Sequence, residues 1–523
     1  MKSRANPIKR GYLYLEEWFN LSFGEKWNPL YHLGPLTFFF FWIALVSGLY
    51  LYIFFNTTVS HAHESLEIIM NEHPLGIGVL MRGLHRYASD AAICTIILHI
   101  FREFSQDRYR GTRWYSWFTG IPTLWMVVLF GITGYWMVWD ELALYVSMGA
   151  SHLLDALPIF SDSMARNFLP GNLSDRFSTL LAFMHLLGQP MFIVFMMWFH
   201  VRRLSHVEVT APKGLAIGVL IALCVLAMFV PATSHAPVNL SKVPAELQID
   251  WFYLNIFPLL QYWSPGQIWL LVGGITIFMM CMPWMPKKNE GAVAVVDLDH
   301  CNGCAQCVMD CPFDAISLQP RTDGAKWENE VIVHPELCAA CGICTGSCPS
   351  SNPSRKATEE GGELKTGIDM PDLTLDKFKQ QTDEALAKLT GDTKIMAFGC
   401  KHGYDIEAFS APNVGTVHFF CTGMMPASLV EYALKNGADG VAISGCRHGD
   451  CFYRLGNHWM DLRIHGERKP ALRPRVDRER VRILGGAETD GKQLHKDFKA
   501  FQNSLASTQT TPSVAATQEV NHD

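Results

Sequence analysis

Long apolar stretches alternate with short polar connections up to about residue 286, after which the chain reads as a soluble protein. An α-helix rises about 1.5 Å per residue, so crossing about 30 Å of hydrocarbon takes about 20 mostly apolar residues. Six stretches approach or exceed this length, and we expect each to be a membrane-spanning helix. They occupy residues 36–55, 79–101, 117–139, 179–201, 214–231 and 266–285, and the fifth is the shortest.

Lysine and arginine are distributed unevenly among the connections. They gather before the first stretch and after the second, fourth and sixth, whereas residues 56–78 contain neither. Short connections rich in Lys and Arg stay on the cytoplasmic side of a membrane. We therefore expect a multi-pass protein of the cytoplasmic (inner) membrane, with both termini and everything after residue 286 in the cytoplasm. The residues concerned are Lys2, Arg4, Lys9, Arg10, Arg102, Arg108, Arg110, Arg113, Arg202, Arg203, Lys213, Lys287 and Lys288.

Two of the predicted spans each carry a pair of histidines, His85 with His99 and His185 with His200. Each pair lies within roughly 60° on one helix face and is separated by about 21 Å along the helix. The predicted orientation brings His85 and His185 to the outer side, and His99 and His200 to the inner side. Neutral imidazole is a common axial ligand of haem iron. The alternative is interfacial histidines that bond backbone carbonyls, but ionisable groups inside membranes are rare and usually functional.

Three stretches make this region similar to cytochrome b of the cytochrome bc complexes. They are "GPLTFFFFWIALVSGLYL" in the first span, "RGLH" at residues 82–85 and "GITGYWMVWDELA" at the end of the third span. The resemblance covers roughly residues 10–285 and implies two haem b groups in contact with Arg82, Gly34 and Gly48. Arg82 would bind a haem propionate, and the glycines would let the haems pack, unless they serve ordinary helix packing. It also implies a candidate homodimer through this region within membrane lipid, although the family's usual eight spans are shortened to six.

The connection between the fifth and sixth spans, "PATSHAPVNLSKVPAELQIDWFYLNIF", resembles the outer quinol-site loop of the same family. That loop usually contains Pro-Glu-Trp-Tyr, whereas here the aligned residues are Ile249, Asp250, Trp251 and Phe252. Asp250 retains a carboxylate that can carry a proton during quinone chemistry, but the proline and the tyrosine hydroxyl are missing. The alternative is a plain surface aspartate.

The 15 cysteines fall into separate groups. Cys94, Cys224 and Cys281 lie in apolar helices, where we expect an inert packing role. The other 12 follow residue 300, in a region that we expect to be reducing and therefore suited to metal binding rather than disulfides.

The stretches "CNGCAQCVMDCP" (301–312) and "CAACGICTGSCP" (338–349) repeat one cysteine spacing, C-x2-C-x2-C-x3-C-P. This run is typical of bacterial two-cluster ferredoxins, in which the fourth cysteine ligates the other cluster. The resemblance implies two [4Fe–4S] clusters. One would be bound by Cys301, Cys304, Cys307 and Cys348, and the other by Cys338, Cys341, Cys344 and Cys311. Structural zinc, which takes four ligands, is the alternative.

Another four cysteines lie in a segment where apolar strands alternate with helices. Cys400, Cys421 and Cys446 each end a strand-like run, and Cys451 follows five residues later. Because the ends of parallel strands meet at one edge of a sheet, we expect the four thiols to converge. The stretch "GADGVAISGCRHGDCFYRLGN" resembles the delta subunit of methyl-viologen-reducing hydrogenase, a likeness that covers about residues 394–485.

The resemblance to the delta subunit implies a [2Fe–2S] cluster and electron delivery to a heterodisulfide-reductase-type flavoprotein. The family usually has an additional cysteine near the first one, which "CKHGYD" lacks. His402 and His448 are therefore conceivable substitute ligands. Structural zinc is again the alternative.

The sequence thus predicts a membrane all-α bundle of about six transmembrane helices with a di-haem cytochrome b (1–289), an α+β two-cluster ferredoxin domain (290–352), a linker with an amphipathic helix (353–393) and a small α/β iron–sulfur domain (394–499). Residues 500–523 are polar and low in complexity, so we expect disorder. The N-terminus lacks a short apolar core with a cleavage site, so we expect no removable signal peptide. The net charge of −6 indicates little, and no basic stripe suggests nucleic acid.

Together these regions predict a chain of electron carriers. No glycine-rich dinucleotide motif, c-type CxxCH motif, or molybdenum or nickel motif is present. We therefore expect a subunit of a quinone-linked oxidoreductase that exchanges electrons between quinone and a cytoplasmic flavoprotein, with an attached dehydrogenase or hydrogenase. The alternative is a haem- and cluster-bearing membrane anchor or redox-sensing assembly module without quinone turnover. The direction of electron flow and the quinone type stay open.

Overall fold

The computed structural model describes residues 6–159, 163–164, 175–241, 244, 246–285, 291–357 and 362–510. The chain divides into two compact units. The helical unit contains Trp27–Arg203 and Val207–Lys287, and the mixed unit contains Met1–Lys26, Leu204–His206 and Lys288–Asp523.

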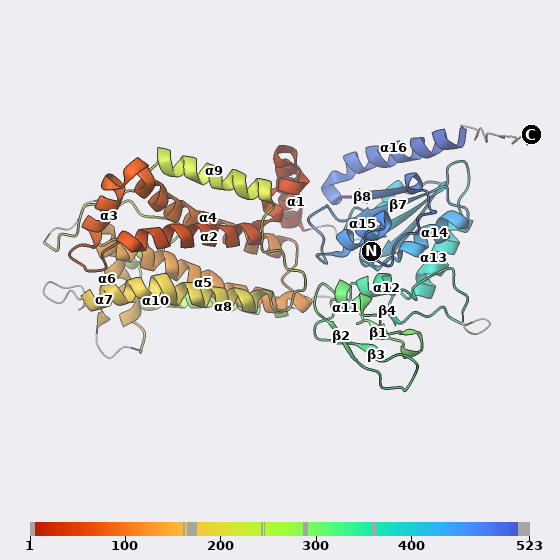
Figure 1. Cartoon of the computed structure of the whole chain (residues 1–523), viewed down its shortest axis with the longest axis horizontal. Coiled ribbons are helices and arrows are strands. Elements are labelled where there is room, and N and C mark those ends of the chain that lie inside the picture. Colours follow the sequence, from red (N-terminus) through yellow and green to blue (C-terminus); the bar gives the residue numbers. More distant parts are fainter. Residues whose placement is uncertain are drawn as a thin grey trace, which may run out of the picture. The chain divides into compact units, whose positions relative to one another are not determined.

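Helices of the helical unit coincide with all six apolar stretches (Figure 1). They are α2 (Leu33–Phe54), α4 (Ile77–Ser105), α5 (Trp114–Met137), α7 (Asp175–Phe183) with its continuation α8 (Gln189–Val201), α9 (Lys213–Phe229) and α10 (Pro265–Cys281). Two shorter helices, α3 (Ala62–Glu72) and α6 (Glu141–Asp155), lie in the connections. The α10 helix begins with a capping box, in which Ser264 and Gln267 satisfy each other's backbone N–H groups.

Among the described residues, four helical segments are long and apolar enough to cross a membrane. They are Leu33–Phe54, Gly111–Met137, Asp175–Val201 and Pro265–Trp284. The α4 helix has the length but carries several charged residues, and α9 has only 17 residues. A total of six crossings therefore stays a prediction.

Small side chains allow α4 to pack closely between its neighbours. The buried residues Ala88 and Ala92 of α4 belong to one core cluster with Phe40 of α2 and Leu223 of α9. On another side of the unit, α5, α6 and α10 share a core cluster with the connection that follows α9. Packing against α2 and α9 therefore fixes the position of α4, the helix that carries His85 and His99.

The first part of the mixed unit consists of short elements around the two cysteine runs. Its elements are β1 (Val295–Val296), α11 (Gln306–Asp310), β2 (Ile316–Pro320), β3 (Asn329–Val333), α12 (Ile343–Ser347) and β4 (Ile368–Asp369). Strands β2 and β3 form an antiparallel hairpin in which Ile316 pairs with Val333.

The linker was predicted to begin at residue 353, but part of this segment belongs to the ferredoxin part. Strand β4 lies within residues 353–393 but pairs with β1, and Leu364 and Met370 are buried in the ferredoxin core. A few apolar residues in a polar segment suffice to anchor it, although they form no recognisable pattern. The predicted amphipathic helix is present as α13 (Leu375–Ala387).

The second part of the mixed unit is a parallel sheet of four strands in the order β6-β5-β7-β8. Its strands are β5 (Ile395–Cys400), β6 (Val414–Phe419), β7 (Gly440–Gly445) and β8 (Val481–Gly485). Helix α16 (Gly491–Thr510) covers one face, and α13, α14 (Ala427–Lys435) and α15 (Gly456–His465) cover the other (Figure 1). The α/β class predicted for this part is what the structure has.

The prediction of disorder from residue 500 is corrected by α16. This helix continues to Thr510, and Phe501 and Leu505 are buried against the sheet. Together with Leu494 and Phe498 they form an apolar stripe at helical spacing, which the polar composition of the segment hides. Residues 511–523 lie outside the described residues.

The N-terminal helix α1 (Pro7–Phe23) belongs to the mixed unit, which differs from the predicted boundary of 1–289. Arg447, directly after Cys446, donates to the Leu13 carbonyl (2.9 Å) and pairs with Glu16 Oε2 (3.3 Å). Both charged side chains are almost completely buried. No local pattern predicts a contact between residues so far apart in the sequence.

Candidate metal centres

The structure brings the four predicted histidines together in the expected pairs. The ring centres of His85 (α4) and His185 are 6.3 Å apart, and those of His99 (α4) and His200 (α8) are 6.4 Å apart. His185 lies in a π-helical turn, Met184–Gly188, between α7 and α8. Such turns are often found at functional sites because they redirect one side chain within a helix.

The spacing of the imidazoles fits an iron between them. A metal–imidazole bond is about 2.0 Å long and the nitrogen lies about 1 Å from the ring centre, so two axial imidazoles have centres about 6 Å apart. His85 Nδ1 donates to the Ala44 carbonyl (2.8 Å), which leaves Nε2 with a free lone pair. The residues present therefore fit a haem with two histidine ligands.

A hydroxyl orients the imidazole of His185. Thr133 Oγ1 lies 2.9 Å from each of three atoms, the Phe130 carbonyl oxygen, Gln189 Oε1 and His185 Nδ1. The single hydroxyl proton is donated to one of the two oxygens, which can only accept. Because its proton is engaged elsewhere, Thr133 accepts from His185 Nδ1–H. The lone pair of His185 then also resides on Nε2, as iron binding requires.

Glycines lie beside the imidazoles. A Cβ on Gly48 would lie 2.7 Å from His85 Cε1, whereas one on Gly34 would meet nothing within 4 Å. On α5, a Cβ on Gly120 would approach His200 and one on Gly134 would approach His185, at 3.1 and 3.2 Å. Sequence reasoning missed these two, although their separation matches that of His85 and His99.

Arg82 lies where a buried anion would be neutralised. Its Nη2 donates to Ser234 Oγ (2.7 Å), and Nη1 is 3.7 Å from Glu67 Oε1. Among the described residues, buried Nη1 has no hydrogen-bond partner. Arg82 also lines a cavity of about 450 Å³ with His63 and His235. A guanidinium at a cavity, with one nitrogen still able to donate, fits the predicted binding of a haem propionate.

Asp250 is buried, which excludes the alternative of a plain surface aspartate. Its side chain is 2% exposed and its Oδ2 accepts from Tyr135 O–H (2.5 Å) and pairs with Arg86 Nη1 (2.7 Å). Its Oδ1 accepts from the Phe252 N–H (2.6 Å). Arg86 also pairs with Asp90, so two carboxylates share one guanidinium. Sequence reasoning missed these partners, although ionisable residues in an apolar span are a usable signal.

The eight ferredoxin cysteines form two neighbouring groups. Burial raises the pKa of the Cys307 thiol, and the neighbouring thiols of Cys348, Cys304 and Cys301 raise it further. Burial likewise raises the pKa of Cys344, which lies near Cys341, Cys338 and Cys311 as well as Cys307. The fourth cysteine of each run therefore lies with the other run, in the interlocked arrangement predicted. Thiols this hard to ionise need a cation to be held as thiolates, which fits iron.

The four cysteines of the third module converge into a ring of thiols. Cys400 Sγ lies 3.8 Å from Cys446 Sγ, and all four thiols are close enough to shift the pKa of their neighbours in the ring. Hydrogen bonds from their neighbours hold the pKa of Cys400 and of Cys451 below the ordinary thiol value. Strand β5 comes first in the sequence but lies between β6 and β7 in the sheet, so the strand order reverses there. Open α/β sheets bind ligands at the carboxyl ends of the strands where the order reverses.

Neither proposed substitute histidine is needed to complete this ring. The imidazole of His402 stacks on Phe452 with ring centres 3.7 Å apart, and its backbone N–H donates to Cys400 Sγ (3.4 Å). His448 is exposed. The four thiols are therefore the better candidates for ligands.

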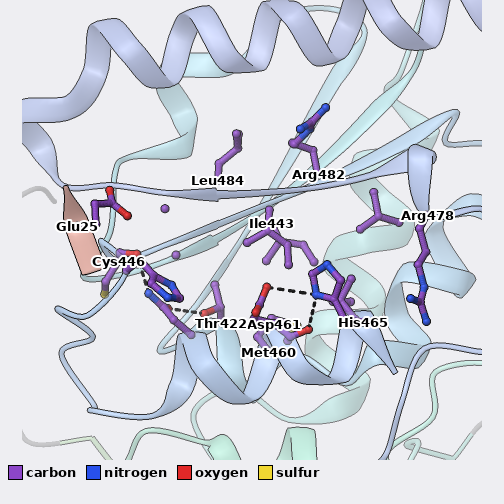
Figure 2. A pocket seen from close by; sticks show the side chains of 17 residues that line it. Glu25, Thr422, Ile443, Cys446, Met460, Asp461, His465, Arg478, Arg482 and Leu484 are labelled. Atoms are coloured by element: carbon purple, nitrogen blue, oxygen red, sulfur yellow. Dashed lines mark hydrogen bonds and ion pairs between the residues drawn. The ribbon is translucent and has the colours of Figure 1, made fainter. Parts of the chain in front are cut away.

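A hollow of about 450 Å³ lies beside Cys446, between β8 and α15 (Figure 2). Arg478, Arg482, Asp461 and His465 line it, and Asp461 lies within 3.3 Å of His465 Nδ1. The hollow gives a polar surface next to one thiol of the ring.

Three separate regions match known families. Residues 20–208 match the cytochrome b/b6/petB model, 300–352 the 4Fe-4S dicluster domain, and 404–508 the delta subunit of methyl-viologen-reducing hydrogenase. The chain is 30% identical to cytochrome b6 of Picosynechococcus sp. over 187 residues, which are 35% of this chain and 83% of that one. The chain belongs to the cytochrome b family. This cytochrome b is also 29% identical to cytochrome b6 of Acaryochloris marina, covering 35% of this chain and 86% of the relative.

Among solved structures, a chain titled "Hyperthermophilic respiratory Complex III" is similar to this cytochrome b. The two share 16% identity with a TM-score of 0.41, and the match covers 52% of this chain and 81% of the other.

The protein is therefore a three-part fusion of a cytochrome b, a dicluster ferredoxin and a hydrogenase-delta-like domain. Membership of the cytochrome b family implies haem b, and the dicluster domain implies [4Fe–4S] clusters. Its apolar helices make it a multi-pass membrane protein of electron transfer.

Proposed function

We propose that the protein passes electrons between the quinone pool and a soluble redox enzyme in the cytoplasm. The observation that carries the proposal is that one chain holds three groups of thiols, most of them buried, and two facing pairs of imidazoles. We assign two haem b groups to the imidazole pairs, two [4Fe–4S] clusters to the ferredoxin thiols and one [2Fe–2S] cluster to the ring of Cys400, Cys421, Cys446 and Cys451. These groups supply one-electron chemistry when bound.

The chain's own residues set the conditions for that chemistry. The Ala44 carbonyl and Thr133 hold the outer imidazoles in the tautomer that can bind metal. The surrounding apolar helices keep water away, so that each carrier exchanges electrons with its neighbours rather than with solutes. The positive-inside distribution of Lys and Arg supports a cytoplasmic location of the thiol-bearing unit.

Asp250 is the residue that we assign to quinone chemistry. Reducing a quinone to a quinol takes two electrons and two protons, and the carboxylate of Asp250 can pass a proton through its contact with Tyr135. Electrons that reach this outer side from the cytoplasm cross the bilayer, which involves about 2.3 kcal/mol per charge per 100 mV. Quinone reduction there draws on the membrane potential, and quinol oxidation there adds to it.

The soluble partner that we favour is a heterodisulfide-reductase-like flavoprotein with an attached dehydrogenase or hydrogenase. The match of residues 404–508 to a hydrogenase delta subunit supports this class of partner. The hollow beside Cys446 is a suitable place for it to dock, because it opens next to one thiol of the third site.

An anaerobic optical and EPR redox titration of the purified full chain tests the proposal. We expect two b-type haems and about ten cluster irons, four in each ferredoxin centre and two in the third. A short-chain quinol should reduce or oxidise the haems, and Asp250→Asn should abolish quinone turnover while both haems remain reducible. Glu72→Gln, at an exposed position of α3, is the matched control and should leave turnover unchanged.

Two outcomes would contradict the proposal. Haems that do not respond to quinol would favour the membrane anchor or redox-sensing module instead. Unchanged turnover in Asp250→Asn would remove the outer site and direct attention to the inner imidazole pair.

A further inference from the structure

A single arginine of α15 lies at the junction between the ferredoxin part and the third module. The side chain of Arg463 is 0% exposed, and its Nη2 donates to Ser347 Oγ (2.5 Å) and forms an ion pair with Asp310 Oδ2. Its Nη1 donates to the Gly423 carbonyl (2.9 Å). One guanidinium therefore connects three separate segments of the chain.

The positions of these partners in the sequence are related. Asp310 and Ser347 hold equivalent places in the two cysteine runs, each directly before the fourth cysteine. They also bond each other, because Ser347 Oγ donates to Asp310 Oδ2 (2.7 Å). Gly423 follows Cys421 by two residues. Arg463 thus contacts a near neighbour of one cysteine in each of the three thiol groups.

The backbones at this junction are too close to admit side chains. A Cβ on Gly346 would lie 2.2 Å from the Gly423 carbonyl oxygen, and a Cβ on Gly423 would lie 2.8 Å from Gly456 Cα. Cys341 of the ferredoxin part therefore lies in the same apolar cluster as two thiols of the third module, Cys421 and Cys451.

The junction carries more positive than negative charge. Asp310 is fully buried and forms ion pairs with the guanidiniums of Arg463 and Arg468. Arg468 Nε donates to Asp310 Oδ1 (2.7 Å). One carboxylate against two guanidiniums leaves a net charge of +1. A buried positive charge favours the addition of an electron nearby, because the interaction of charges is strong where water is absent.

We propose that Arg463 is a positioning residue for electron transfer, which holds the third thiol site against the ferredoxin centre of Cys311, Cys338, Cys341 and Cys344 and whose charge favours the reduced state of the ferredoxin centres. The inference rests on the proposed function, namely that these thiols hold iron–sulfur clusters. In the transfer, the third centre loses one electron and the ferredoxin centre gains it, and no bond or proton moves. The electron comes from the soluble partner when the flow is toward the membrane.

Two variants of the full chain separate charge from geometry. Arg463→Lys keeps the positive charge, but one ammonium cannot reach Ser347, Asp310 and Gly423 together. We expect unchanged midpoint potentials and at least a tenfold loss in the rate of electron exchange between the third centre and the ferredoxin. Rapid-freeze EPR measures this rate. Arg463→Gln should in addition shift the reduction equilibrium of the ferredoxin centres tenfold toward the oxidised state, about 59 mV for one electron.

Arg475→Gln is the matched control, because Arg475 is an exposed arginine of the same module that pairs with Glu431. It should change neither the potentials nor the exchange. Iron content is measured for every variant, since a variant that has lost cluster iron would move both readouts for a trivial reason. If Arg463→Gln loses iron, two other single variants test the inference. These are Arg463→Lys and Ser347→Ala, and the latter deletes one contact without changing the charge.

Potentials and exchange rates equal to those of the wild type in iron-replete Arg463→Lys and Arg463→Gln would overturn the inference. So would unaltered exchange in both Arg463→Lys and Ser347→Ala. Failure of the proposed function is distinguishable, because the wild-type chain itself would then show no cluster signals, whatever residue 463 is.

Discussion

Replacing Thr133 by valine removes one hydroxyl beside His185 and keeps the size of the side chain nearly constant. In the structure this hydroxyl is 2.9 Å from His185 Nδ1 and also bonds Gln189 (2.9 Å). Loss of a hydrogen bond to a metal-binding histidine typically lowers metal affinity 10- to 100-fold, equivalent to about 1.4–2.8 kcal/mol. We therefore expect Thr133→Val to weaken retention of the outer haem and to change its midpoint potential.

Thr119 near the inner pair offers the matched control. Its hydroxyl is 3.4 Å from His200 Nδ1, a longer and weaker contact than the 2.9 Å of Thr133 to His185, so Thr119→Val removes less. Haem content and potentials are measured by pyridine haemochrome and optical redox titration, in which the two haems are resolved. The reasoning is refuted if Thr133→Val leaves both haems as in the wild type, or if the two variants affect the same haem equally.

Three further predictions concern the mixed unit. Phe501→Ala should lower the free energy of unfolding by about 3–5 kcal/mol because Phe501 of α16 is buried against the sheet, and calorimetry that shows no change would favour a disordered tail instead. Cys421→Ser should remove the iron of the third centre alone, so total iron counted chemically should fall by about two atoms per chain; a loss of all cluster iron would contradict separate centres. Burial raises the pKa of Asp369 to about 6 from 3.8, so the folded state binds the proton more tightly than the unfolded state. Stability should consequently fall by about 3 kcal/mol as the pH rises from about 4 to above 6, and denaturation of Asp369→Asn should lack this pH dependence.

Local spacing predicted which histidines and which cysteines lie together, because these residues are repeated along the chain. The separation of His85 and His99 matches that of His185 and His200, so one face of each helix could be identified without knowing how the helices pack. The two cysteine runs likewise carry their arrangement in their spacing. The strand-end positions of Cys400, Cys421 and Cys446 were enough to predict that these thiols converge.

Contacts between distant segments could not be predicted in this way. Arg463 binds Asp310 and Ser347 from more than 100 residues away, and nothing near any of the three indicates the others. Arg86 and Tyr135 were missed as partners of Asp250 because three separate segments must pack before they meet. The apolar stripe of α16 was not predicted, because the segment was assessed by its overall polar composition and only four apolar residues form the stripe.

The pairing of Glu16 with Arg447 has a consequence for the order in which the protein is made. The two residues are 431 positions apart, so at a synthesis rate of 5–20 residues per second the ribosome reaches Arg447 about 20–90 s after Glu16. The contact between α1 and Arg447 can therefore form only after all of the predicted spans have been synthesised. Because Arg447 directly follows Cys446, this contact joins the first helix of the chain to the segment that carries a thiol of the third module. A chain that ends before residue 447 lacks this contact.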